Sequence, residues 1–173
     1  MSDLEGSWTI DPAHSTIGFT VRHAVSKVRG EFTDFTSTVT STGPDTADVT
    51  ATIQAASFDS RSEMRDAHIK SPDFLDVEKF PTLEFTGKVA GGALSGDLTI
   101  HGVTRPVTFT LNEPLEVAKD PFGGPDFAGT EATAEISRKD FGLTWNQALE
   151  TGGVLVGDAV KIALDVSYQR ASA

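Results

Sequence analysis

An alternation of apolar and polar residues at every second position runs through most of this chain and constrains its fold more than any other feature. Successive side chains of a β-strand point to opposite faces, so a strand buried on one side repeats its apolar residues with a period of two. In the stretch 47–55, for example, Ala47, Val49, Ala51 and Ile53 share one face. The pattern recurs about eight times along the sequence and predicts an all-β chain.

The connections between these strands favour antiparallel pairing. Turn-forming sequences such as STGPDTAD at 41–48 and AGGA at 90–93 separate the strands. Connections this short join antiparallel neighbours, because parallel strands need crossovers of a dozen or more residues. Closing the sheet on itself also removes exposed edge strands. We therefore expect one domain over residues 1–173, built as an eight-stranded antiparallel up-and-down barrel.

The hairpin at 94–111 has a sequence that predicts its own register. Folding it so that apolar residues fall on one face places Leu98 opposite Val107. Pro106 has no backbone N–H and cannot complete a hydrogen-bonded pair with Thr99. A four-residue loop is therefore favoured over a tight two-residue turn.

One charged segment, at 60–76, interrupts the alternation and predicts a helix. Ser60 and Glu63 have the spacing of a capping box, in which each side chain satisfies a free backbone N–H at the helix start. The helix is expected near 61–75, where it would cover part of the barrel. Residues spaced three and four apart form its expected apolar face: Met64, Ala67 and His68.

Composition excludes several classes of function. The chain has 14 basic and 25 acidic residues, and its formal net charge of −11 repels both nucleic acid and an anionic bilayer. In so acidic a chain, most arginines are expected to pair with surface carboxylates. The absence of cysteine excludes disulfides, thiolate catalysis and cysteine-based metal sites. No apolar run is long enough for a transmembrane segment.

The sequence contains no pattern typical of catalysis or metal binding. Its four histidines lack the spacing of a metal-binding motif, so we predict no metal. There is no nucleophile elbow, no phosphate-binding loop and no dinucleotide motif, so no catalytic residue is assigned. Two alternatives stay open. One is a metal-dependent or other enzyme that uses His, Asp and Arg at the barrel mouth, and the other is a stress-related scaffold with a filled barrel.

Five segments, in this order along the chain, carry a resemblance to a known family. They are WTIDPAHSTIGFTVRH at 8–23, VRGEFTDF at 28–35, RDAHIKSPDFLDVEKFPTLEF at 65–85, GDLTIHGVTRPV at 96–107 and SRKDFGL at 137–143. Together they resemble the signature segments of the YceI-like family. The resemblance covers essentially the whole chain.

This resemblance implies a lipocalin-like barrel that binds or transports a long apolar or amphiphilic ligand without catalysis. The ligand would be a polyisoprenoid, an isoprenoid quinone or a fatty-acid-like lipid. No cofactor is required, although a bound polyisoprenoid or isoprenoid quinone is compatible with the fold. Many family members carry a signal peptide. The acidic N-terminal segment here lacks one, so we expect a cytoplasmic location unless a leader has been removed. A homodimer is also compatible with the sequence.

The alternating apolar faces supply the candidate lining of the ligand cavity. We expect the following residues to point inward: Ile17, Phe19, Val21, Phe85, Leu98, Ile100, Phe109, Leu164 and Val166. One end of the barrel would be closed by Met64, Ile69, Phe74 and Phe80. Each of these residues also suits an ordinary packed core. Arg22, Arg65 and His68 are expected to hold the cover or to meet a polar head group.

Overall fold

The computed structural model describes residues 4–112, 115–150 and 153–171, and β-strands make up most of them. The strands are β1 (Ser7–Ile10), β2 (Thr16–His23), β3 (Ser26–Phe32), β4 (Phe35–Gly43), β5 (Thr46–Gln54), β6 (Phe58–Asp59), β7 (Thr82–Ala90), β8 (Ala93–Ile100), β9 (Val103–Leu111), β10 (Glu116–Ala118), β11 (Phe127–Ser137) and β12 (Val156–Arg170). Within the described ranges, the helices are α1 (Glu63–Lys70) and the 3₁₀ helices η1 (Pro12–His14), η2 (Ala55–Ser57) and η3 (Arg138–Phe141). The ends of the expected domain, 1–3 and 172–173, lie outside the described residues.

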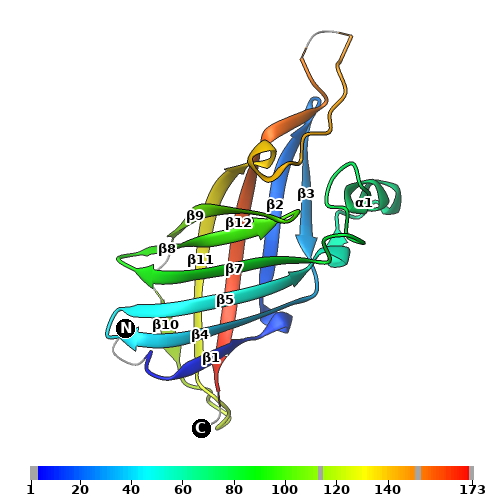
Figure 1. Ribbon diagram of the computed structural model, residues 1–173. Coiled ribbons are helices and arrows are strands. Elements are labelled where there is room, and N and C mark those ends of the chain that lie inside the picture. The colour runs from blue at the N-terminus through cyan, green and yellow to red at the C-terminus, as the bar shows by residue number, and fades with distance from the viewer. Residues whose placement is uncertain (1–3, 113–114, 151–152, 172–173) are drawn as a thin grey trace.

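The strands form one closed antiparallel barrel (Figure 1). β1 and β2 lie one after the other along the same side of β12 and count as one interrupted strand. β3 and β4 form a second interrupted strand, and β5 and β6 form a third. Counted in this way, eight strands follow one another around the barrel in chain order. β11 closes the barrel by pairing with β12 along its whole length. The predicted eight-stranded up-and-down barrel is confirmed.

β12 is the longest strand and organises one end of the molecule. Its 15 residues pair with β11 on one side and with β1 and then β2 on the other. A register shift between Val156 and Val160 interrupts the pairing with β2, as a β-bulge does. The β2–β3 hairpin and the adjoining part of β12 extend beyond the other strands, at the top of Figure 1.

The turn of the β8–β9 hairpin differs from the sequence prediction. Two residues, His101 and Gly102, form the turn, and their φ angles of 55° and 72° suit the type I′ turn that joins twisted strands. Leu98 consequently lies opposite Arg105. The predicted four-residue loop was wrong because histidine is among the residues that tolerate the left-handed backbone conformation a tight turn requires.

Pro106 fits this register without weakening the hairpin. The pair beside the turn, Ile100 and Val103, is hydrogen-bonded, and hydrogen-bonded and non-hydrogen-bonded pairs then alternate along the strands. Asp97 and Pro106 therefore form a non-hydrogen-bonded pair. The missing N–H of the proline removes no hydrogen bond between β8 and β9.

The α1 helix begins two residues later than the predicted capping box. Its N-cap is Ser62, whose Oγ accepts a hydrogen bond from the backbone N–H of Arg65 at 3.3 Å. Ser60 is instead buried, with 4% of its surface exposed. Its N–H donates to Asp66 Oδ1 at 2.9 Å, and its Oγ accepts from Arg65 Nε at 2.7 Å. The predicted box was wrong because Asp66 takes both the N–H and the hydroxyl of Ser60.

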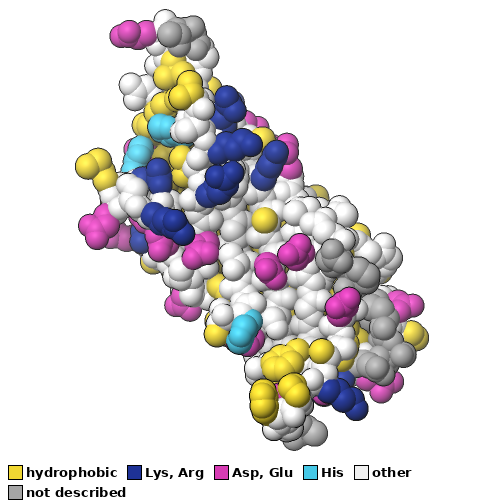
Figure 2. Space-filling model, turned by 180° about the vertical axis from the view of Figure 1, so that it is seen from behind, with side chains coloured by type: hydrophobic (Ala, Val, Ile, Leu, Met, Phe, Trp, Pro, Cys, Tyr) yellow, Lys and Arg dark blue, Asp and Glu magenta, His cyan; other side chains and the backbone are white. Residues whose placement is uncertain are grey.

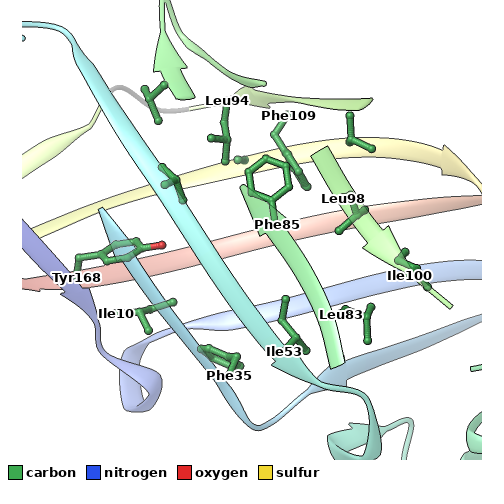
Figure 3. Close-up of a cluster of buried hydrophobic side chains, with 14 of the residues drawn as sticks. Ile10, Phe35, Ile53, Leu83, Phe85, Leu94, Leu98, Ile100, Phe109 and Tyr168 are labelled. Carbon is green, nitrogen blue, oxygen red and sulfur yellow. The ribbon is translucent and has the colours of Figure 1, made fainter. Parts of the chain in front are cut away.

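The core lies inside the barrel, where apolar side chains from every long strand meet. Figure 3 shows this cluster, to which these buried residues belong: Ile10, Phe35, Ile53, Leu83, Phe85, Leu94, Leu98, Ile100, Phe109 and Tyr168. The rings of Phe85 and Phe109 meet edge to face, with centroids 5.6 Å apart. In the described part of the chain, no helix is long and apolar enough to cross a membrane.

Candidate ligand-binding cavity

The barrel encloses an apolar cavity of about 260 Å³. Its lining extends along β12 from Val156 to Tyr168, which at 3.3 Å per residue is roughly 40 Å of strand. Because the lining runs along most of the longest strand, the cavity follows the barrel lengthwise, and we call it the tunnel. A tunnel of this form fits a flexible chain better than a compact ring system.

Most of the residues that the sequence predicted as lining do contact this cavity. They are Ile17, Phe19, Val21, Ile69, Phe74, Phe85, Leu98, Ile100, Phe109, Leu164 and Val166. The strand residues come from β2, β7, β8, β9 and β12, and the other two come from α1 and the turn after it. Period-two alternation brings them together, because the inner face of each strand is its apolar face.

Met64 and Phe80 lie elsewhere, and their predicted placement needs correction. Met64 is 86% exposed on the outer side of α1, whereas Ile69 of the same helix reaches the cavity. Phe80 packs against the turn of the β8–β9 hairpin, with its ring centroid 4.6 Å from that of His101 and the two ring planes tilted by 58°. The predicted face of α1 was therefore wrong. Polar contacts of Arg65, rather than an apolar stripe, orient this short helix.

An aromatic cluster fixes α1 to the segment that follows η3. The ring of His68 lies 4.7 Å from that of Trp145 and 5.2 Å from that of Phe74, measured between centroids. His68 Nε2 also lies 2.9 Å from Asp73 Oδ2, a contact that holds the imidazole edge-on to both aromatic rings. His68 thus helps to fix the cover, one of its two predicted roles. Trp145 was not predicted as part of this site, since nothing near it in the sequence indicates the contact.

Arg138 anchors the same segment from inside the barrel wall. Its side chain is almost fully buried, with 3% of the residue exposed. The guanidinium donates to the carbonyl oxygens of Leu143 and Trp145, at 2.6 and 2.9 Å, and to those of Val156 and Gly157, at 3.1 and 2.8 Å. Burial lowers the pKa of Arg138, and the nearby charge of Asp158 partly opposes this effect.

A short hydrogen-bonded chain of Ser37 and Tyr168 provides a polar point on the cavity wall, whose lining also includes Thr130 and Arg138. Ser37 Oγ donates to the carbonyl oxygen of Thr50 at 2.8 Å and lies 2.8 Å from Tyr168 Oη. Since the only proton of the serine hydroxyl goes to Thr50, the tyrosine must be the donor to Ser37. Both hydroxyl oxygens keep acceptor lone pairs, but no proton is left to donate. Burial raises the pKa of Tyr168, and the hydrogen bond with Ser37 partly opposes this effect.

The two predicted arginines serve different purposes. Arg65 donates through Nε and Nη2 to Ser60 Oγ and O, at 2.7 and 2.5 Å, and so fixes the start of α1 to the end of β6. Arg22 lies on the outer face of β2 and is exposed, away from the cavity.

The four histidines lie in separate parts of the fold. His14 ends η1, His23 ends β2, His68 lies on α1 and His101 lies in the β8–β9 turn. Among the described residues, no three His, Cys, Asp or Glu side chains gather as a metal-binding group. The histidines consequently do not form one shared site.

An eight-stranded antiparallel barrel closed around an apolar cavity is the architecture of the lipocalin-like barrels. Residues 8–168 match the family model described as the YceI-like domain, and the chain belongs to this family. A UPF0312 protein of Staphylococcus aureus strain MSSA476 is 39% identical over 166 residues, which cover 94% of this chain and 96% of the relative.

Solved structures share the fold at lower identity. BcnA of Burkholderia cenocepacia has a TM-score of 0.71 at 23% identity, covering 91% of this chain and 98% of that one. A polyisoprenoid-binding domain from Saccharophagus degradans, implicated in plant cell wall breakdown, has a TM-score of 0.70 at 14% identity, covering 95% and 98%. At these identities the likeness establishes the fold alone. Campylobacter jejuni YceI has a TM-score of 0.67 at 26% identity, covering 86% of this chain and 88% of that one.

Proposed function

We propose that this protein binds and carries a long apolar or amphiphilic molecule inside its barrel, without catalysis. The observation that carries the proposal is the apolar cavity inside the barrel, whose lining runs along β12 from Val156 to Tyr168. A polyisoprenoid, the chain of an isoprenoid quinone or a fatty-acid-like lipid has the shape that such a tunnel accepts. The name of the Saccharophagus degradans neighbour, which is a polyisoprenoid-binding domain, agrees with this class of ligand.

Burial of the ligand chain would supply the affinity. Each buried CH₂ group contributes about 0.8 kcal/mol, so the gain in free energy grows with the number of carbons that the cavity buries. Association and ordering of the ligand cost about 4–15 kcal/mol. The balance permits useful binding together with release to an acceptor that offers a similar apolar environment.

A series of prenols of increasing chain length tests this proposal. Trp8 is 1% exposed and lines the cavity, so its fluorescence should respond to a bound chain. We expect affinity to rise by up to about fourfold for each added CH₂ group until the chain fills the tunnel, and then to level off. Affinity that is independent of chain length would contradict the proposal.

Within this ligand class, the polar point on the wall favours a molecule that can donate a hydrogen bond. Ser37 and Tyr168 offer acceptor lone pairs but no free proton. A prenol hydroxyl can donate to them, whereas a quinone carbonyl cannot. One hydrogen bond is worth about 1 kcal/mol, so an alcohol should bind roughly fivefold more tightly than its methyl ether.

The double variant Ser37→Ala/Tyr168→Phe removes both acceptors and tests this preference. We expect the alcohol and the ether to bind it with nearly equal affinity. Ser95→Ala is the matched control, because Ser95 is exposed and its hydroxyl contacts only Thr108 on the outside of the barrel. If the double variant keeps the wild-type preference, the polar point does not select the ligand.

A further inference from the structure

Four basic side chains gather on the outer face of the sheet formed by β12, β2 and β3. Arg22 lies directly opposite Lys27 on the neighbouring strand, and Arg29 follows Lys27 on the same face. Thr20 lies between Arg29 and Lys161, which extends the group across all three strands. All four cations are exposed. Figure 2 shows Lys and Arg side chains gathered close to the protruding end of the molecule.

These cations, here called the basic face, have no carboxylate partner in contact. Across the described residues, none of the four lies within 4.0 Å of a carboxylate oxygen, although the chain has 25 acidic and only 14 basic residues. The expectation that most arginines pair with carboxylates is therefore wrong for Arg22 and Arg29. Two carboxylates border the basic face: Glu135 lies directly opposite Lys161 on β11, and Glu31 follows Arg29 on the same face of β3. Like charges on adjacent strands repel each other, a cost that an anionic partner would relieve.

Exposed apolar side chains lie at the tip of the same three strands. Val25, in the turn between β2 and β3, is 94% exposed, and Val154, just before β12, is 54% exposed. A hydrogen bond of 2.7 Å from the N–H of Ala24 to the carbonyl oxygen of Leu155 holds the two segments together. A single exposed valine is ordinary. Two exposed valines at one tip, next to cations that have no carboxylate in contact, give this surface an apolar end beside the basic face.

The basic face lies directly over one end of the cavity. Val21, Val28 and Val160 alternate along the strands with its cations and line the tunnel from the inner side. A partner bound to this face would therefore lie within one strand thickness of the ligand.

We propose that the basic face and the valine tip dock on a lipid bilayer that carries anionic head groups. The four cations would lie against the head groups, and Val25 and Val154 would insert among them. The net charge of −11 does not prevent docking, because salt screens the protein's acidic residues that lie more than about 8–10 Å from the head groups. Docking would bring the tunnel next to the apolar environment that can supply or receive the ligand, so this inference rests on the proposed function.

Vesicle sedimentation of the ligand-stripped full chain tests the docking. Vesicles of phosphatidylcholine alone are compared with vesicles that contain about 30% phosphatidylglycerol, at low and at high salt. We expect the protein to bind the vesicles that contain phosphatidylglycerol and not those of pure phosphatidylcholine. High salt should abolish this binding. Each basic residue near the surface strengthens binding about fivefold, so Lys27→Gln/Arg29→Gln should weaken it roughly 25-fold.

The matched control is Lys88→Gln/Lys119→Gln, which makes the same change in net charge away from the basic face. Lys88 pairs with Asp48 on the other side of the barrel, and Lys119 is exposed in the loop after β10. We expect less than a twofold effect. Equal losses in both variants, or failure of the wild type to bind anionic vesicles, would overturn the docking proposal.

Prenol binding, measured on the same preparations without vesicles, separates the two proposals. Protein that binds prenol but not vesicles contradicts docking alone. Protein that binds vesicles but no prenol contradicts the proposed function and leaves the docking surface supported.

Discussion

Replacing Arg138 by methionine should release the segment after η3 and destabilise the protein by about 3–5 kcal/mol, because several backbone carbonyl groups lose their donor. Arg138 donates to four carbonyl oxygens. One of them, on Val156, keeps a second donor in Asn146 Nδ2 at 2.7 Å. The carbonyls of Leu143, Trp145 and Gly157 lose the guanidinium, and an unsatisfied buried group costs about 1–3 kcal/mol. Removing the desolvated charge of Arg138 offsets part of this loss of stability.

Urea unfolding followed by tryptophan fluorescence measures the effect. Trp8 reports on the barrel interior, and Trp145 reports on the released segment. Arg138→Lys keeps the charge but has fewer donors and no planar fork, so we expect it to recover only part of the loss. Arg22→Met is the matched control, because Arg22 is exposed and its replacement should change stability by less than about 0.5 kcal/mol.

The prediction is refuted if Arg138→Met lowers the free energy of unfolding by less than about 1 kcal/mol, which would mean that water or relaxed backbone satisfies the freed carbonyls. It is also refuted if Arg138→Met and Arg22→Met cost the same. In either case the segment containing Trp145 must be held mainly by its aromatic contacts with His68 and Phe74.

Three further predictions concern the cavity and the barrel wall. Tyr168 is the only tyrosine in the sequence, so the ultraviolet titration of tyrosinate reports its raised pKa directly. The stability that neutral Tyr168 contributes below about pH 10 should be lost as the pH rises through that pKa. The Tyr168→Phe variant should not show this loss. Gly96→Ala should lower stability by about 1–3 kcal/mol in thermal unfolding, because a Cβ there would lie within 2.5 Å of the backbone of the adjacent strand. Trp145→Ala should accelerate prenol release in stopped-flow measurements, because it removes the ring that joins α1 to the segment after η3.

The barrel itself was predictable because its signal is local. Period-two alternation tells each strand which side faces inward, and short connections then allow little but antiparallel neighbours. For this reason the predicted strand residues of the lining, such as Ile17, Phe109 and Leu164, do contact the cavity. The register of the β8–β9 hairpin was not predictable in the same way. It depends on whether His101 accepts a positive φ angle, which alternation does not reveal.

Contacts between distant segments account for what sequence analysis missed. Ser37 and Tyr168 are 131 positions apart, and their hydrogen bond exists only because β4 and β12 face the same cavity. The basic face likewise depends on the register that places Arg22 opposite Lys27. The orientation of α1 was missed because the polar contacts of Arg65 with Ser60 decide it, whereas the prediction relied on an apolar stripe.

Native mass spectrometry of the freshly purified protein, followed by organic extraction, shows whether the barrel carries a long-chain ligand. A tunnel of about 260 Å³ lined by apolar side chains predicts a co-purifying molecule with a long hydrocarbon or prenyl chain. The bound mass should disappear after extraction and return when a long-chain prenol is added. A protein that purifies empty and takes up no prenol, fatty alcohol or fatty acid would contradict the account.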